Sequence, residues 1–159
     1  MGRKKRELTS PVGMKVLFWL YVLLLVFFVV VKFNGSLESL RDRIEATRYI
    51  RQMEPGYNLN LVPLHTIKSQ MEHIHSGWAV RNLVANGMAF VPFGYLLPGA
   101  YRRLRKWWMV LGIGLLTICV VEVTQYVTYL GACDVDDLLL NMAGCIVGWF
   151  GYLLSKRNE

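Results

Sequence analysis

The chain has few cysteines, and their spacing forms no pattern. Cys119, Cys133 and Cys145 are its three cysteines. An odd number without close spacing supplies neither a disulfide framework nor a metal-binding motif, so we expect all three to be packing residues. The sequence also lacks an internal repeat, a low-complexity tract, a nucleophile paired with a base, and a glycine loop for phosphate. Acyl-transfer and phosphate-transfer chemistry therefore finds no support in its motifs.

Charged residues are missing from the longest apolar run, Val16 to Val31, which Lys15 and Lys32 enclose. The run is slightly shorter than a ~30 Å hydrocarbon core, and the two lysines can snorkel to complete the span. A cleavable signal peptide is the alternative, because the N-terminus is basic, but no small-residue cleavage site follows the run. We therefore predict an uncleaved first transmembrane helix.

Three further apolar segments follow, each with a few polar side chains. Four spans in a chain of 159 residues that is 54% hydrophobic leave no room for a second domain. We predict an all-α membrane protein, a bundle of four transmembrane helices over residues 14–155 behind a basic cytoplasmic tail over residues 1–13. The three segments are Trp78–Leu97, Trp107–Tyr129 and Leu138–Leu154. Pro92 and Pro98 predict a kink near the end of the segment that begins at Trp78.

The net charge of +7 has a distribution typical of membrane topology rather than of nucleic-acid binding. Basic residues gather before the first span, between the second and third spans, and after the fourth. The connector between the third and fourth spans has no lysine or arginine. The positive-inside rule then predicts a multi-pass protein of the cell membrane with both termini in the cytoplasm. The gathered residues are Arg3, Lys4, Lys5, Arg6, Lys15, Arg102, Arg103, Arg105, Lys106, Lys156 and Arg157.

The long outer segment, Asn34 to Ser76, divides into two parts. Leu37, Leu40 and Ile44 recur at helical spacing among charged residues. This pattern predicts either an amphipathic helix on the outer interface or a solvated helix packed on the bundle, and both stay open. Pro55-Gly56 ends the helix, and a loop containing Pro63 then returns to the mouth of the bundle.

Three histidines follow in the same segment, His65, His73 and His75. Histidines two residues apart can bind a metal, but no carboxylate pattern or cysteine completes a site here. We expect a surface loop, no metal site and no cofactor. Asp134, Asp136 and Asp137, in the connector between the last two spans, are the weak candidates for metal ligands.

Polar side chains from three spans are predicted to lie in the outer half of the membrane. Asn82 and Asn86 are four residues apart, and Glu122 and Gln125 are three apart, so each pair lines one side of its helix. Asp134 or Asp136 is suited to cap the fourth helix. The candidate ligand-binding residues are Arg81, Asn82, Asn86, Glu122, Gln125, Asp134, Asp136, Asp137 and Asn141, with Asn60 from the outer loop.

Two interpretations of this constellation are open. In the first, Arg81 pairs with Glu122 and the amides tie the helices together. In the second, the groups line a polar pocket that opens outward and holds a ligand. We favour the pocket, because a buried ion pair adds little stability by itself and the connector aspartates have no evident packing role.

The same residues carry a family resemblance. Asn60-Leu-Val-Pro63, Asn82…Asn86…Phe90-Val-Pro92-Phe93-Gly94 and Glu122-x-x-Gln125…Asp134-x-Asp136-Asp137-x-x-x-Asn141-x-x-Gly144 follow one another across residues 20–154. In these motifs the chain resembles the VanZ-like family, which is named after a teicoplanin-resistance protein. It departs from the family pattern at Leu64, where a phenylalanine is frequent, and at Gly131-Ala132, where many members have a basic residue.

The resemblance implies a membrane protein that contributes to resistance against teicoplanin and other lipoglycopeptides or envelope-active compounds. We expect it to act by binding a ligand rather than as an enzyme. Membrane lipids are the expected partners, together with a lipoglycopeptide or a lipid-linked envelope precursor. Two alternatives are an enzyme with Glu122 as catalytic acid or base and a carrier of polyprenyl-phosphate lipid in which Arg81 meets the phosphate. A homodimer stays open.

Overall fold

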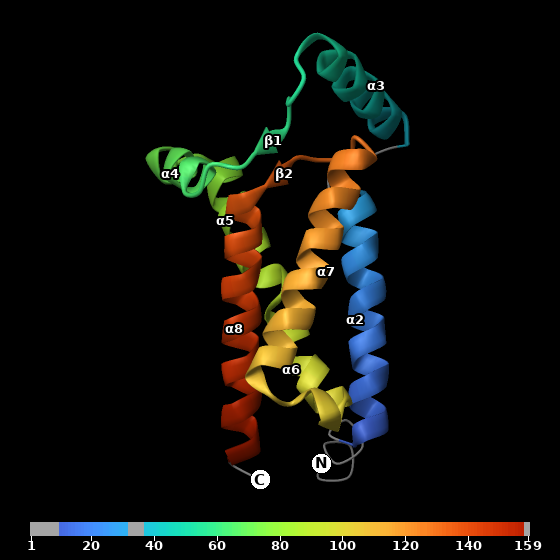
Figure 1. Cartoon of the computed structure of the whole chain (residues 1–159), viewed down its shortest axis with the longest axis vertical. Coiled ribbons are helices and arrows are strands. Elements are labelled where there is room, and N and C mark those ends of the chain that lie inside the picture. Colours follow the sequence, from blue (N-terminus) through green and yellow to red (C-terminus); the bar gives the residue numbers. More distant parts are fainter. Residues whose placement is uncertain (1–9, 32–36, 158–159) are drawn as a thin grey trace.

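The computed structural model describes residues 10–31 and 37–157 (Figure 1), so residues 1–9 of the predicted basic tail lie outside the described residues. Almost all of the described chain is helical. In chain order the elements are α2 (Pro11–Val31), α3 (Leu37–Met53), β1 (Leu59–Asn60), α4 (His65–Glu72), α5 (Gly77–Ala89), α6 (Val91–Ala100), a 3₁₀ turn (Arg102–Leu104), α7 (Trp107–Val127), β2 (Cys133–Asp134) and α8 (Val135–Arg157).

Three helical segments are long and apolar enough to cross a membrane. They are α5 with α6 (Gly77–Ala100), α7 and α8, and the described part of α2 (Pro11–Phe27) adds a shorter apolar helix. Figure 1 shows α2, α7 and α8 running along the long axis of the molecule, with α3, α4, β1 and β2 gathered at one end. The predicted membrane-type helical fold is confirmed at this level.

The predicted kink in the second apolar segment is a break between α5 and α6 at Phe90. Pro92 follows directly and has no N–H, so it cannot continue the hydrogen-bond ladder of α5. The carbonyl of Ala89, at the break, instead accepts a hydrogen bond of 2.7 Å from the hydroxyl of Tyr21 on α2. A broken helix is tolerated in a membrane when a neighbour satisfies its free backbone groups, as Tyr21 does here.

Glycines let α8 approach the broken helix at backbone distance. A Cβ added at Gly144 would lie 2.3 Å from the carbonyl oxygen of Gly87, and one at Gly148 would lie 2.0 Å from that of Val91. In the other direction, a Cβ on Gly94 would lie 2.0 Å from the carbonyl oxygen of Cys145. Gly144 and Gly148, four residues apart, therefore form the seam between α8 and α5–α6, a small-xxx-small contact.

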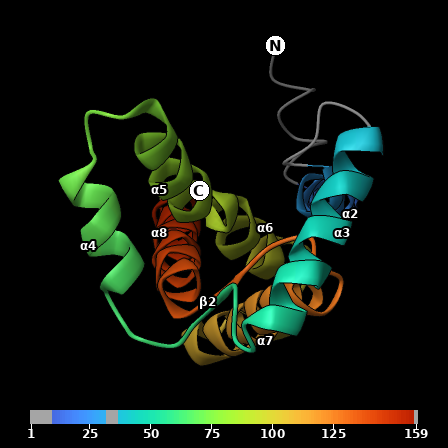
Figure 2. The same cartoon turned by 90° about the horizontal axis from the view of Figure 1, so that it is seen from above.

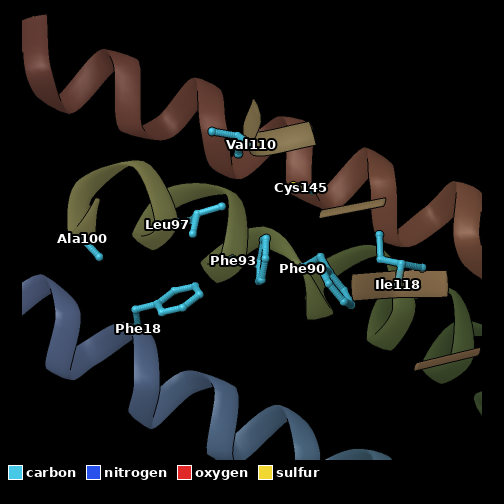
Figure 3. Packing of buried hydrophobic residues seen from close by; sticks show 8 residues of the cluster. All are labelled: Phe18, Phe90, Phe93, Leu97, Ala100, Val110, Ile118 and Cys145. Atoms are coloured by element: carbon cyan, nitrogen blue, oxygen red, sulfur yellow. The ribbon is translucent and has the colours of Figure 1, made fainter. Parts of the chain in front are cut away.

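The apolar core lies on α6, where α2, α7 and α8 meet it (Figure 3). Phe18 of α2 contacts Phe93 of α6, with ring centroids 5.6 Å apart. Val110 and Ile118 of α7 and Cys145 of α8 are fully buried in the same cluster. This core holds the helices together on the side away from the outer segment, which leaves the opposite end free to build a polar junction.

The outer segment joins the bundle through a short parallel strand pair. Leu59 is the register partner of Cys133, and Asn60 is the partner of Asp134. Figure 2 shows α3 and α4 lying on either side of this pair and across the bundle axis. The expectation of a surface loop at the histidines is wrong for His65, which begins α4. The carboxylate of Asp136 caps this helix, and no residue near His65 in the sequence indicates the cap.

Candidate functional site

Asp134 joins three segments of the chain through its side chain. One carboxylate oxygen, Oδ1, accepts from the backbone N–H of Asp136 at 2.8 Å, which caps the first turn of α8. The same oxygen accepts from the Nδ2 of Asn60 at 3.0 Å, and Oδ2 accepts from the hydroxyl of Thr66 at 2.5 Å. The prediction that Asp134 or Asp136 caps the fourth helix is therefore confirmed for Asp134.

Asp136 caps a different helix, α4, from a distance of about seventy residues along the chain. Its carboxylate accepts from the backbone N–H of Leu64 at 2.5 Å and from that of Ile67 at 3.0 Å. Leu64 precedes α4 and has no capping side chain of its own. The carboxylate of Asp136, which is fully buried, thus replaces the missing cap and faces the positive end of the α4 dipole.

These bonds correct one expectation from the sequence. The connector aspartates were expected to have no packing role, but Asp134 and Asp136 hold the outer segment to the bundle. All the hydrogen-bond donors just described are neutral N–H and O–H groups, so the two carboxylates act here as acceptors that join backbone and side-chain donors from three segments. We name the group of Asn60, Thr66, Asp134 and Asp136 the aspartate junction.

A second polar layer lies beneath the aspartate junction. Glu122 of α7 is buried, and its Oε2 accepts from the backbone N–H of Asp134 at 3.3 Å. Asn86 of α5 donates through Nδ2 to the Oδ1 of Asp137 on α8. Asn141, one turn below Asp137, is buried, and its Oδ1 has no hydrogen-bond partner among the described residues. The structure thus brings together candidates from α5, α7 and α8, as the sequence predicts.

Two candidates lie outside this layer. Arg81 is exposed in an open hollow of about 550 Å³ on the outer face of α5, and no contact joins it to Glu122. Five residues separate Arg81 from Asn86, a rotation of about 140° at ~100° per residue, so the two cannot face the same side of α5. Asn82 is half-buried on α5. Gln125 lies near the end of α7, where its carbonyl accepts from the N–H groups of Leu130 and Gly131.

The hollow around Arg81 combines apolar and cation-bearing groups. Ser76, which precedes α5, donates its hydroxyl to the carbonyl of His73 and makes no capping bond to α5. The first N–H groups of α5, next to this hollow, therefore have no side-chain cap. Its lining residues are His75, Ser76, Gly77, Val80, Arg81, Val84 and Ala85.

Arg51 is a structural residue that the sequence analysis missed. It donates through Nη1 to the carbonyl of Tyr126, at the end of α7, over 2.6 Å. Its guanidinium carbon lies 3.6 Å from the ring centroid of Tyr126 and 4.8 Å from that of Tyr129. A cation there complements the negative end of the α7 dipole and stacks on two aromatic faces. The two tyrosines three residues apart, at the end of a span, were the available signal.

The pKa of the Cys133 thiol is raised by its burial and by the carboxylates around it. Burial raises the pKa of this thiol, and the charges of Glu122 and Asp134 raise it further. The protonated thiol is favoured, so Cys133 is expected to be a poor nucleophile although it belongs to the outer connector. Within the described residues, no group of three histidine, cysteine, aspartate or glutamate side chains is placed to hold a metal ion.

This shift gives a measurable pH dependence. In a Cys119→Ala, Cys145→Ala background, maleimide should label Cys133 more slowly than a free cysteine at pH 8, with its rate profile displaced to higher pH. Adding Glu122→Gln removes one of the negative charges that raise the pKa, so the profile should return toward lower pH. Glu72→Gln, at an exposed position on α4, is the matched control. An unchanged profile in the Glu122→Gln protein would contradict this assignment of the field.

A comparison with protein families connects this geometry to a known group. The model of the family described as VanZ/LLP1 matches residues 18–156. The chain belongs to the VanZ/LLP1 family. No curated protein and no solved structure matches the chain in the corresponding searches. In this VanZ/LLP1 protein, the residues that carried the resemblance from sequence, among them Asn60, Asn86, Glu122 and Asp134, are bonded at or just beneath the aspartate junction.

Proposed function

We propose that this VanZ/LLP1 protein binds a lipid-tailed amphiphile on the outer side of the cell membrane and thereby lowers susceptibility to teicoplanin and related lipoglycopeptides. The observation that carries the proposal is the hollow at Arg81. A guanidinium and uncapped helix N–H groups at its upper end suit an anionic head group, and Val80 and Val84 below them suit an acyl chain.

The proposed topology has four spans with both termini in the cytoplasm. The helix α2 has 21 residues, about 31 Å at ~1.5 Å per residue, which matches a ~30 Å hydrocarbon core. The start of α2, the basic turn Arg102–Leu104 and the basic end of α8 lie at one end of the molecule, and the aspartate junction lies at the other (Figure 1). The positive-inside rule supports the cytoplasm for the basic end.

In this proposal the polar layer is a support rather than a ligand pocket. The carboxylate oxygens of Asp134 and Asp136 accept hydrogen bonds from the outer segment, and Glu122 is buried beneath them. The ligand-contacting role therefore falls to Arg81, and the remaining candidates position α5 and α4 around it. The membrane domain extends over residues 14–155, and no catalytic step is assigned to Glu122.

The test is expression in a bacterium sensitive to teicoplanin, with membrane insertion checked for every variant. The wild-type chain should raise the inhibitory concentration, and Arg81→Ala should abolish the increase because the anionic head group loses its cation. Arg102→Ala, which removes an exposed arginine at the opposite end, is the matched control and should protect like the wild type.

The same assay separates binding from catalysis. Glu122→Gln keeps the shape and one acceptor oxygen of the side chain but cannot transfer a proton. Protection should survive this change at equal protein levels. Loss of protection in an inserted, stable Glu122→Gln protein would favour the enzyme hypothesis, and full protection by Arg81→Ala would remove the proposed binding site.

A further inference from the structure

The stretch between β1 and α5 exposes large apolar side chains to an unusual degree for a segment outside the predicted spans. Five such side chains are between 43% and 66% exposed. Contiguous exposed apolar surface on a soluble loop is unfavourable and marks a contact with a partner or a membrane. The five residues are Leu61, Val62, Leu64, Met71 and Ile74. We name them the apolar rim.

Several backbone N–H groups of this stretch have hydrogen-bond acceptors within the protein, as a segment immersed in a membrane requires. The N–H of Val62 donates to the side chain of Asn60, and the N–H groups of Leu64 and Ile67 donate to Asp136. The N–H groups of His65 and Lys68 donate to carbonyls within the stretch. Unpaired backbone groups are costly in lipid, and Asp136 of α8 removes that cost for two N–H groups at the start of α4.

The apolar rim lies next to the start of α5, which also exposes apolar side chains. The His73 ring at the end of α4 lies 5.9 Å from the ring of Trp78, between their centroids. Trp78 is exposed at the start of α5, and Val84 and Met88, four residues apart, are exposed on one side farther along that helix. Figure 2 shows α4 beside α5 and across the bundle axis, the orientation of a helix in a membrane surface. Tryptophan favours that same level of a bilayer.

We propose that residues 61–74 form an interfacial membrane anchor, in which the apolar rim is immersed in the outer leaflet. The partner is a lipid surface. Gln70 faces the protein and is buried, whereas Lys68 and Glu72 are exposed. On α4, Lys68 lies about 60° from Met71 and Glu72 about 100° from it, so charged side chains border Met71, and the long stem of Lys68 can keep its charge at the level of the head groups. Amphipathic helices of this kind bury their apolar face about 5–10 Å into the interface. This anchor does not require a ligand at Arg81.

The experiment places an environment-sensitive fluorophore at single cysteines in the full chain, reconstituted in phosphatidylcholine vesicles at high lipid-to-protein ratio. Leu61→Cys and Met71→Cys probe the apolar rim, and Glu72→Cys is the matched control on the same helix. Native cysteines are replaced by alanine. The rim probes should emit at shorter wavelength, lose intensity to spin-labelled lipid and resist iodide. The control should show the reverse, with quenching by iodide.

The outcomes are distinct. Shallow spin labels should quench the rim probes more strongly than labels near the bilayer centre, because the anchor lies in the interface. Iodide quenching of Leu61 and Met71 equal to that of Glu72 would overturn the proposal. Energy transfer between rim probes on separate copies, without lipid quenching, would also overturn it and would make the rim an interface between copies. Neither result bears on drug susceptibility, so this proposal and the proposed function can fail separately.

Discussion

Asp136→Ala is expected to release α4 from the bundle while the transmembrane helices stay folded. The substitution leaves the N–H groups of Leu64 and Ile67 without an acceptor at a buried site. Hydrogen bonds to a charged group are worth ~1.5–3 kcal/mol each, so two of them predict a loss of about 3–6 kcal/mol in local stability. The effect is large because one side chain supplies the whole cap of α4.

Amide hydrogen exchange measures this release. The N–H groups of Lys68 and His73 donate to carbonyls inside the segment and not to Asp136. Their exchange rates therefore measure the opening of α4, not only the loss of the two hydrogen bonds to Asp136. Their exchange should accelerate by about 100-fold or more, since each ~1.4 kcal/mol is a factor of ten. Asp136→Asn should give an intermediate rate, because its amide keeps one acceptor oxygen, and Glu72→Ala should leave exchange near that of the wild type. Unchanged protection in the Asp136→Ala protein would show that α4 is held by other contacts.

Gly148→Ala is expected to prevent close packing of α8 against α6. The added Cβ would lie 2.0 Å from the carbonyl oxygen of Val91, a backbone atom that cannot rotate away. Overpacking costs ~1–3 kcal/mol where side chains can adjust, and a backbone clash should exceed about 3 kcal/mol. The change therefore acts on the whole bundle rather than on one end of it.

Unfolding by sodium dodecyl sulfate in mixed micelles measures this change as a loss in the free energy of unfolding. Gly144→Ala, with its Cβ 2.3 Å from the carbonyl oxygen of Gly87, should behave in the same way. Gly112→Ala is the matched control, since nothing lies within 4 Å of its added Cβ, and should change stability by less than ~1 kcal/mol. Similar losses at Gly148 and Gly112 would contradict the glycine seam.

The helices were predictable because their signals are local. Long apolar runs predict the membrane-capable segments, and Pro92 predicts the break at Phe90. The four-residue spacing of Gly144 and Gly148 is a local signal of the same kind for the seam. Each depends on residues within a few turns of one another. The four-span topology stays a prediction, because length and composition mark three segments and a shorter apolar helix.

The candidate site was only partly predictable, because its contacts join distant segments. The hydrophobic periodicity of the sequence does not predict that Asp136 caps α4, because the capping residue and the start of the helix are 72 residues apart. For the same reason Thr66 was missed as a partner of Asp134. The position of Arg81 was within reach of the sequence, because an offset of five residues from Asn86 already separates the two faces of α5.

The distance in sequence between Asp136 and α4 orders the events of biosynthesis. When α3, β1 and α4 leave the ribosome, the strand β2 and the carboxylates that bind them belong to a stretch that has yet to be synthesised. Loop closure over such a separation comes after local helix formation. Docking of the outer segment is consequently a late step, which follows the synthesis of α7, β2 and the start of α8.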